Sequence, residues 1–197
     1  TSPVTYCQDD VAVPLTATGS NLLWYTVSIG GVGDPIAPTP STAIATTLSF
    51  FVSQTVLGCE GARAQLDVVI NPTPAAPGVT TPVTYCQNDA AVPLTATGAN
   101  LLWYTVAVGG VGNAVAPTPS TVAAGTTSYF VSQTVLGCEG PRAQLDVVVN
   151  PTPALPGVTS PVTYCEGDAA IPLTATGSNL LWYTLAVGGV GNPVAPT

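Results

Sequence analysis

The sequence predicts an all-β protein built from small sandwich domains in tandem, and three observations support this prediction. A 79-residue unit recurs along the 197-residue chain, with 62 of 79 positions identical between the first two copies. Val, Thr, Ile, Tyr and Phe occur in short runs between Gly, Pro, Asn and Asp, which is the pattern of strands and turns. No segment keeps a helical period. A unit of this length can bury its own core, so each copy should fold as a domain.

The repeat also sets the expected domain organisation. The pentapeptide Leu-Leu-Trp-Tyr-Thr recurs every 79 residues. We expect a first domain with a truncated N-terminal edge, a second complete domain, and a third domain that contains only its first half. Their bounds are 1–71, 72–150 and 151–197. The third copy is expected to be cut from a longer array, or else to be completed by a strand from another chain.

The strands of the first copy follow from composition, in chain order. Strand-forming residues bounded by turn signals predict strands at 3–7, 13–18, 22–27, 47–56 and 64–70. Residues 36–41 should be extended but broken by Pro, and residues 58–61 should form a turn. Prolines are then frequent in residues 71–78, which predicts a semi-rigid linker, or a linker that merges into the next first strand, and the segment recurs at 150–157.

Six or seven short strands around one mid-chain Trp predict an immunoglobulin-like β-sandwich in each copy. The expected core residues are Trp24, Trp103 and Trp182. Alternation along residues 22–27 then points Leu22, Trp24 and Thr26 inward. The residues between them should form an apolar outward stripe, a candidate interaction surface made of Leu23, Tyr25 and Val27 in copy one and Leu102, Tyr104 and Val106 in copy two.

The five cysteines follow the repeat. Two Cys per copy stand 52 residues apart, which predicts one disulfide within each of the first two domains, Cys7–Cys59 and Cys86–Cys138. Cys165 would need a partner outside the chain. Each bond should join the end of the first strand to the last hairpin, at one pole of the domain. Zinc would need carboxylates to complete four ligands, and two buried free thiols suit such an array poorly. Persistent disulfides indicate an extracellular location.

Several motifs carry a family resemblance. Tyr6-Cys7-Gln8, Leu22-Leu23-Trp24-Tyr25-Thr26 and Gly58-Cys59-Glu60 recur with the repeat. Together with the Ala-Pro-Thr-Pro-Ser-Thr and Phe-Val-Ser-Gln-Thr segments, they resemble the immunoglobulin-like repeats of Bacteroidota surface proteins. Such repeats occur in gliding-motility adhesins and in cargo of the type IX secretion system. The resemblance implies an extracellular structural repeat and carries over no catalytic residue.

Composition excludes several classes of function. Ten acidic residues face two Arg and no Lys or His, for a net charge of −8. Two cations cannot follow a phosphate backbone, so we expect no nucleic-acid partner. Thr, Pro and Gly interrupt every apolar run before it could span a membrane. Neither a Ser-His-Asp or Cys-His set nor a phosphate-binding loop is present, so we expect no enzyme and no cofactor.

Two groups of charged residues are candidate sites. Asp9, Asp10 and Glu60 would converge if Cys7 bonded Cys59, which would suit calcium. Asn88 replaces Asp9 in copy two, which would remove one calcium ligand. This favours the alternative that these carboxylates end strands and face solvent. Arg63 and its equivalent Arg142 are expected to pair with a nearby Glu rather than to contact a glycan. O-linked sugar on the Thr-rich linkers remains open.

These observations favour a structural function. We expect a stretch of a cell-surface adhesin, stalk or filament that gives reach and stiffness. The low-charge strand faces suggest self-association, with neighbouring repeats or chains as partners. The alternatives are a module that binds glycans or a surface, and a spacer within a large secreted enzyme.

Overall fold

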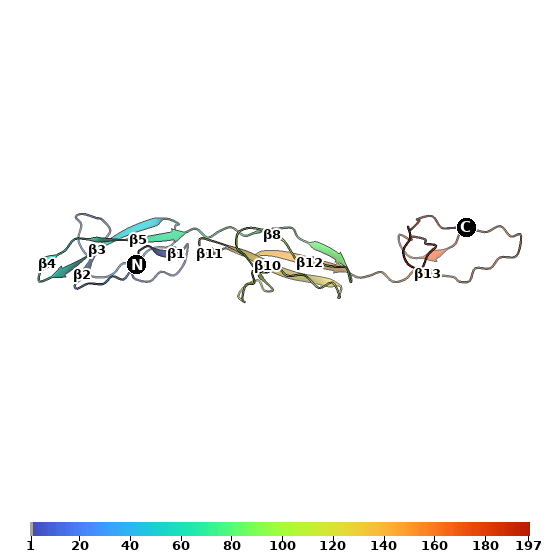
Figure 1. Cartoon of the computed structure of the whole chain (residues 1–197), viewed down its shortest axis with the longest axis horizontal. Coiled ribbons are helices and arrows are strands. Elements are labelled where there is room, and N and C mark those ends of the chain that lie inside the picture. Colours follow the sequence, from blue (N-terminus) through green and yellow to red (C-terminus); the bar gives the residue numbers. More distant parts are fainter. Residues whose placement is uncertain (1) are drawn as a thin grey trace. The chain divides into compact units, whose positions relative to one another are not determined.

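The computed structural model describes residues 2–197, and these residues form strands and no helix (Figure 1). The internal contacts divide the chain into two units, one ending at Asn150 and the other beginning at Pro151. The first unit contains copies one and two. Because no described helix exists, none is long and apolar enough to cross a membrane.

Copy one is built on a single regular sheet. Its strands are β1 (Val4–Cys7), β2 (Leu22–Tyr25), β3 (Thr47–Val56), β4 (Cys59–Glu60) and β5 (Ala64–Asn71). They are arranged in the order β1-β5-β3-β2, and β4 extends β3 as a short hairpin. The neighbours of β3 are antiparallel to it, whereas β1 runs parallel to β5. The prediction for 47–56 matches β3 at both ends, and the predicted strands 3–7, 22–27 and 64–70 correspond to β1, β2 and β5.

Copy two repeats this sheet and adds one strand pair. Its strands are β7 (Val83–Cys86), β9 (Leu101–Tyr104), β10 (Gly125–Val135), β11 (Cys138–Glu139) and β12 (Ala143–Asn150). The order is β11-β10-β12-β7, with β9 on β10. In addition, β6 (Gly78–Val79) pairs with β8 (Ala96–Thr97) in antiparallel fashion. The residues that we predicted to be linker therefore end in a strand of the second copy.

The second layer of copy one consists of extended segments rather than a regular sheet. The predicted strand at 13–18 is wrong for this copy, because no regular strand forms there. Leu15 donates its backbone N–H to the carbonyl of Pro38 at 2.9 Å. Prolines on both segments remove the donors that further ladder bonds would need. The layer nevertheless completes the core, because Leu15 is buried against Trp24.

The cores of copies one and two are equivalent. Trp24 and Trp103 are both buried, which confirms them as core residues. Around Trp24 lie the buried side chains of Leu15, Val52, Leu66, Val68 and Ile70. Leu22 packs against this cluster as predicted, but Thr26 is exposed because β2 ends before it, at Tyr25.

The third copy forms a separate small unit. Its regular strands are β13 (Gly157–Val158) and β14 (Ala175–Thr176), which pair with each other. Trp182 is only partly buried, so its assignment to a core is wrong in this structure. In copies one and two the Trp packs against residues of β3 and β5 or of β10 and β12. Those elements lie in the half of the repeat that the 197 residues do not include for copy three.

Candidate functional site

The direction of β1 separates the two cysteines of copy one. The register aligns Cys7 with Asn71, at the carboxyl end of β5. Cys59 belongs to β4, which precedes the first residue of β5, and Figure 1 shows β4 and the end of β1 at opposite ends of the sheet. At about 3.3 Å per residue, β5 places roughly 23 Å between them. A disulfide needs Cα atoms within about 7 Å, so the predicted bond Cys7–Cys59 is wrong.

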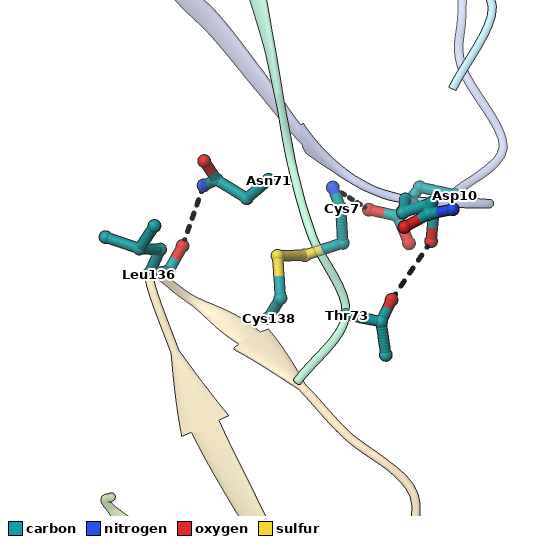
Figure 2. The surroundings of a disulfide bond; sticks show 7 residues. Cys7, Asp10, Asn71, Thr73, Leu136 and Cys138 are labelled. Carbon is teal, nitrogen blue, oxygen red and sulfur yellow. Dashed lines mark hydrogen bonds between the residues drawn. A yellow bond between two sulfur atoms is a disulfide. The ribbon is translucent and has the colours of Figure 1, made fainter. Parts of the chain in front are cut away.

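Cys7 instead bonds Cys138 of the second copy. Their Cα atoms are 5.5 Å apart, and 131 residues separate them in the sequence. Figure 2 shows the bond where the end of β1 meets the hairpin that carries Cys138. The predicted pair Cys86–Cys138 is therefore also wrong. Cys59, Cys86 and Cys165 are free and exposed. The separation equals one in-repeat spacing plus one full repeat, so the repeat period is compatible with this pairing as well as with the predicted one.

Two hydrogen bonds reinforce the joint between copies one and two. The side-chain amide of Asn71 donates to the carbonyl oxygen of Leu136 at 3.0 Å, as Figure 2 shows. The Nε2 group of Gln133 donates to the carbonyl oxygen of Ala75 at 2.8 Å. One partner of each bond lies at the end of copy one or in the linker, and the other lies on the β10–β11 hairpin. The hairpin of copy two is therefore held by the disulfide and by the linker at once.

Gly140 allows the linker to approach closely. A Cβ atom at this position would overlap the carbonyl oxygen of Pro74 and lie 3.1 Å from its carbonyl carbon. At the equivalent Gly61 in copy one, the nearest atom to such a Cβ is 3.5 Å away, which is ordinary contact. The requirement for glycine thus arises from the joint and not from the hairpin itself.

The two near-identical copies show which residues the joint covers. Cys138 and Gly140 are buried, whereas their equivalents Cys59 and Gly61 are exposed. Leu136 is 69 % exposed, and its equivalent Leu57 is 99 % exposed. The sequences of the two hairpins match here, so the difference comes from the linker of copy one, which covers the hairpin of copy two. Copy one presents the same hairpin uncovered.

The hairpin turn carries a signal that the sequence reading missed. Leu57 and Leu136 have φ angles of 50° and 52°, in the left-handed region that apolar residues seldom adopt. Each precedes a Gly with φ of 83° and sits in a two-residue hairpin loop, where both residues need positive φ. Asn-Gly is the usual choice for such a turn. The same backbone conformation occurs in both copies, although only Leu136 lies at the joint, where its carbonyl oxygen accepts from Asn71.

The acidic residues near Cys7 organise a turn. Asp10 accepts a hydrogen bond on Oδ2 from the backbone N–H of Cys7 at 2.8 Å (Figure 2). Its own carbonyl accepts from the hydroxyl of Thr42 at 2.6 Å. Glu60 lies at the opposite end of the sheet, on β4, so these carboxylates do not converge. Within residues 2–197 no group of three or more His, Cys, Asp or Glu side chains is placed to hold a metal ion.

Tyr25 is buried, which corrects its prediction as an exposed residue. It is 6 % exposed, and Tyr104 is the same. The hydroxyl of Tyr25 donates to Glu60 at 2.5 Å, and that carboxylate also accepts from the hydroxyl of Ser53 at 2.6 Å. The guanidinium carbon of Arg63 lies 3.2 Å from the ring centroid. Alternation does place Tyr25 on the face opposite Trp24, but this polar cluster covers it.

Arg63 contacts the neighbouring loop. Its Nη1 donates to the carbonyl oxygens of Val27 and Gly30 at 2.9 and 2.7 Å. These hydrogen bonds and the stacking on Tyr25 occupy the side chain that we predicted to pair with Glu60. Arg142 makes the same contacts to Val106, Gly109 and Tyr104. The cluster fixes the Gly-rich loop to the sheet in both copies.

Hydroxyl donors also shift the acidity of these carboxylates. The hydroxyls of Ser53 and Tyr25 lower the pKa of Glu60, and Arg63 adds a smaller electrostatic contribution. Ser132 and Tyr104 lower the pKa of Glu139 in the same way. The hydroxyl of Ser49 and the amide of Gln65 lower the pKa of Asp67, and the equivalent groups do so for Asp146.

The proposed apolar stripe is therefore only partly available. Leu23 and Leu102 are half-buried, and Val27 and Val106 are each 45 % exposed. Since the Tyr between them is covered in each copy, the predicted surface does not form a continuous patch. The most exposed apolar side chains lie instead on loops and turn tips, among them Val11, Val32 and Leu57.

Comparisons with known proteins bear on the second copy. Residues 74–151 match the family model described as Ig-like domain CHU_C associated. A search of curated proteins finds no match. Two human structures are similar: mucin-like protocadherin EC1-2, at 14 % identity over 77 % of this chain and 97 % of that one, with a TM-score of 0.26; and CDH23 EC21-23, at 13 % identity over 98 % and 91 %, with a TM-score of 0.32. These TM-scores are too low for either similarity to support a conclusion about this chain. The family match shows that the second copy is similar to Ig-like domains, and the near-identical first copy shares that similarity.

Proposed function

We propose that this chain is a load-bearing section of an extracellular stalk or surface fibre, of the kind found in adhesins. The single observation that carries the proposal is the disulfide from Cys7 to Cys138, which joins consecutive Ig-like copies. A bond inside one domain stabilises only that domain. A bond across a joint limits how far the two domains can separate, which is the property a stalk needs.

The path of force through the chain supports this function. A pull on the two ends reaches Cys7 and crosses the disulfide directly to Cys138. Cys7 and Cys138 are 131 residues apart in the sequence. The residues between them, which include most of both cores, are then shielded from extension. In tandem arrays without such bonds, the domains unfold one at a time under load. An oxidising, extracellular setting is the compartment in which this bond would persist.

Single-molecule stretching of the whole chain tests the proposal. The oxidised chain should extend only by the segments outside the disulfide loop. Reduction, or the variant Cys7→Ser, should release a further 430–470 Å, at about 3.3–3.6 Å per residue. Cys59→Ser is the matched control and should leave the oxidised extension unchanged. Full extension of the oxidised chain would contradict the proposal.

The structure gives less support to a glycan-binding role. The Tyr that could stack on a sugar lies beneath Arg63, at 3.2 Å from ring centroid to guanidinium carbon. A spacer within a secreted enzyme would use the same joint in the same way, so it differs from a stalk only in what the array connects.

A further inference from the structure

The peptide bond between Asp34 and Pro35 differs in chemistry from its equivalents in the other copies. Copy one reads Gly33-Asp34-Pro35, whereas copy two reads Gly-Asn-Ala at 112–114 and copy three reads Gly-Asn-Pro at 191–193. Asp-Pro occurs at no other position of the sequence. The carboxylate of Asp can close a five-membered ring on its own peptide carbonyl, and the tertiary amide nitrogen of Pro is a better leaving group than a secondary one. Copy one therefore contains the one peptide bond of this chain that combines both properties.

Strand β2 holds the carbonyl group of this bond. Trp24 and Asp34 form an antiparallel bridge, in which the N–H of Trp24 donates to the carbonyl oxygen of Asp34 at 2.8 Å and receives the reverse bond at 2.9 Å. Gly33 allows this close approach, because a Cβ atom there would lie 2.6 Å from the hydroxyl oxygen of Tyr25. A fixed N–H donor stabilises the negative charge that a carbonyl oxygen gains when its carbon is attacked. The bridge thus supplies an oxyanion donor at the Asp34–Pro35 bond.

The side chain of Asp34 is held beside the same bond. Its Oδ1 accepts a hydrogen bond from the backbone N–H of Ile36 at 2.8 Å, and the ring that this hydrogen bond closes contains the Asp34–Pro35 bond. A nucleophile held next to its target reacts faster, because the entropy of bringing the two together is already lost. Asp34 and Pro35 are both exposed, and Asp34 lines a cavity of about 330 Å³. Water and protons therefore reach the bond.

We propose that copy one cleaves its own backbone between Asp34 and Pro35 in mildly acidic surroundings, and that the fold promotes this reaction. Oδ2 of Asp34 attacks the carbonyl carbon of the same residue, and the electron pair of the C=O bond moves onto the oxygen that Trp24 holds. When the carbonyl re-forms, the C–N bond breaks and its electron pair goes to the nitrogen of Pro35. That nitrogen takes two protons from solvent and leaves as a secondary ammonium. Water then opens the cyclic anhydride to two carboxylates and returns two protons, so the net reaction is hydrolysis.

Acid drives the reaction through the leaving nitrogen of Pro35, which must be protonated. The rate should therefore rise as the pH falls from neutral toward the acid transition of the fold. Among the described residues that line the cavity, Asp34 is the only charged one and Tyr25 is the only other that titrates. Arg63 adds a fixed positive charge, since it donates to two carbonyl oxygens of the same loop, and Glu60 accepts the hydroxyl of Tyr25.

The disulfide of the joint keeps the cleaved chain together. Cys7 lies on fragment 1–34 and Cys138 lies on fragment 35–197. Strands β1 and β2 of the first fragment also pair with β5 and β3 of the second. Cleavage therefore leaves the array continuous and makes the Cys7–Cys138 bond the covalent link between the two fragments. A reductant then releases fragments that it could not release from the intact chain.

Incubation of the whole oxidised chain at about pH 5, above the pKa range of free carboxyl groups, tests the proposal. Electrophoresis without reductant should show one band of full size, and reductant should divide it into fragments 1–34 and 35–197, which mass spectrometry identifies. The same chain unfolded in urea, with its disulfide intact, should cleave roughly tenfold or more slowly, because the bridge to Trp24 is lost. Cleavage in urea at an equal or higher rate would overturn the role of the fold. A folded chain that stays intact would overturn the site.

Variants taken from the other copies separate the two halves of the chemistry. Asp34→Asn gives copy one the Asn-Pro of copy three, and Asp34→Asn with Pro35→Ala gives it the Asn-Ala of copy two. Copy two keeps the bridge with that sequence, so both variants should fold as the parent does, which thermal melts check. Neither variant should cleave at position 34, because an amide is a poor nucleophile. Cleavage of either one at the rate of the parent would overturn the role of the carboxylate.

A transplant into copy two tests whether the local geometry is sufficient. There the N–H of Trp103 donates to the carbonyl oxygen of Asn113 at 2.8 Å, and Oδ1 of Asn113 accepts from the N–H of Val115 at 2.9 Å. Asn113→Asp with Ala114→Pro should therefore create a second cleavage site after residue 113, at a rate similar to the first. An intact bond there in a folded variant would overturn the proposal. The load path through Cys7–Cys138 does not require cleavage, so failure here leaves the proposed stalk function standing.

Discussion

Glycine at position 140 shows how one residue serves the joint rather than the domain. Its neighbour across the joint is the backbone of Pro74, whereas a Cβ at Gly61 would meet only an ordinary contact at 3.5 Å. Gly140→Ala should therefore loosen the joint at a cost of about 1–3 kcal/mol, the usual range for overpacking. Gly61→Ala should change little. The rate at which dithiothreitol reduces Cys7–Cys138 measures the difference, and equal rates in the two variants would contradict the assignment.

The hydrogen-bonded carboxylates predict an acid dependence of stability. Folding lowers the pKa of Glu60, Asp67, Glu139 and Asp146. A lowered pKa contributes stability above the unfolded value, about 3.9–4.3, and that contribution is lost as the pH falls through the folded value. The melting temperature should thus be flat near neutral pH and drop below about pH 4.3.

Two substitutions identify the residues behind that drop. Glu60→Gln together with Glu139→Gln should lower stability at pH 7 and flatten the acid transition in thermal melts. Asp34→Asn is the matched control, because copy two carries Asn113 at the equivalent position and folds in the same way. An acid transition that is unchanged in the double variant would show that these carboxylates do not carry the effect.

At the scale of elements, the parallel first strand decides the architecture of the joint. Strand formers predict β1, β3 and β5 in their correct places, because propensity and turn signals are local. Nothing local says that β1 lies parallel to β5, and that direction moves Cys7 to the far end of the sheet. The burial of Tyr25 could not be predicted from the sequence for a similar reason. The residues of the cluster that covers it, Ser53, Glu60 and Arg63, come from distant segments. Trp24 was predictable because its strand alternates and its bulk needs a core.

At the scale of the whole molecule, the low charge takes on a definite meaning. Ten acidic residues and two Arg leave long surfaces without charge. Both Arg hold a Gly-rich loop to the sheet, and Glu60, Asp67 and their equivalents in copy two accept hydrogen bonds from side chains of neighbouring strands. Cohesion between copies depends instead on backbone carbonyls, amide side chains and sulfur, which need no ionic partner. The repeat period predicts such a tandem, but only the fold shows that its covalent bond crosses from one copy to the next.

The positions of the two Arg residues allow a direct test of that bond. Trypsin has only Arg63 and Arg142 as cleavage sites, so it divides the denatured chain into 1–63, 64–142 and 143–197. Cys7 and Cys59 lie on the first fragment, and Cys86 and Cys138 on the second. Digestion of the monomer without reductant should give fragments 1–63 and 64–142 joined by one disulfide, and reductant should separate them. Three unlinked fragments before reduction would place the bonds within copies and contradict the joint.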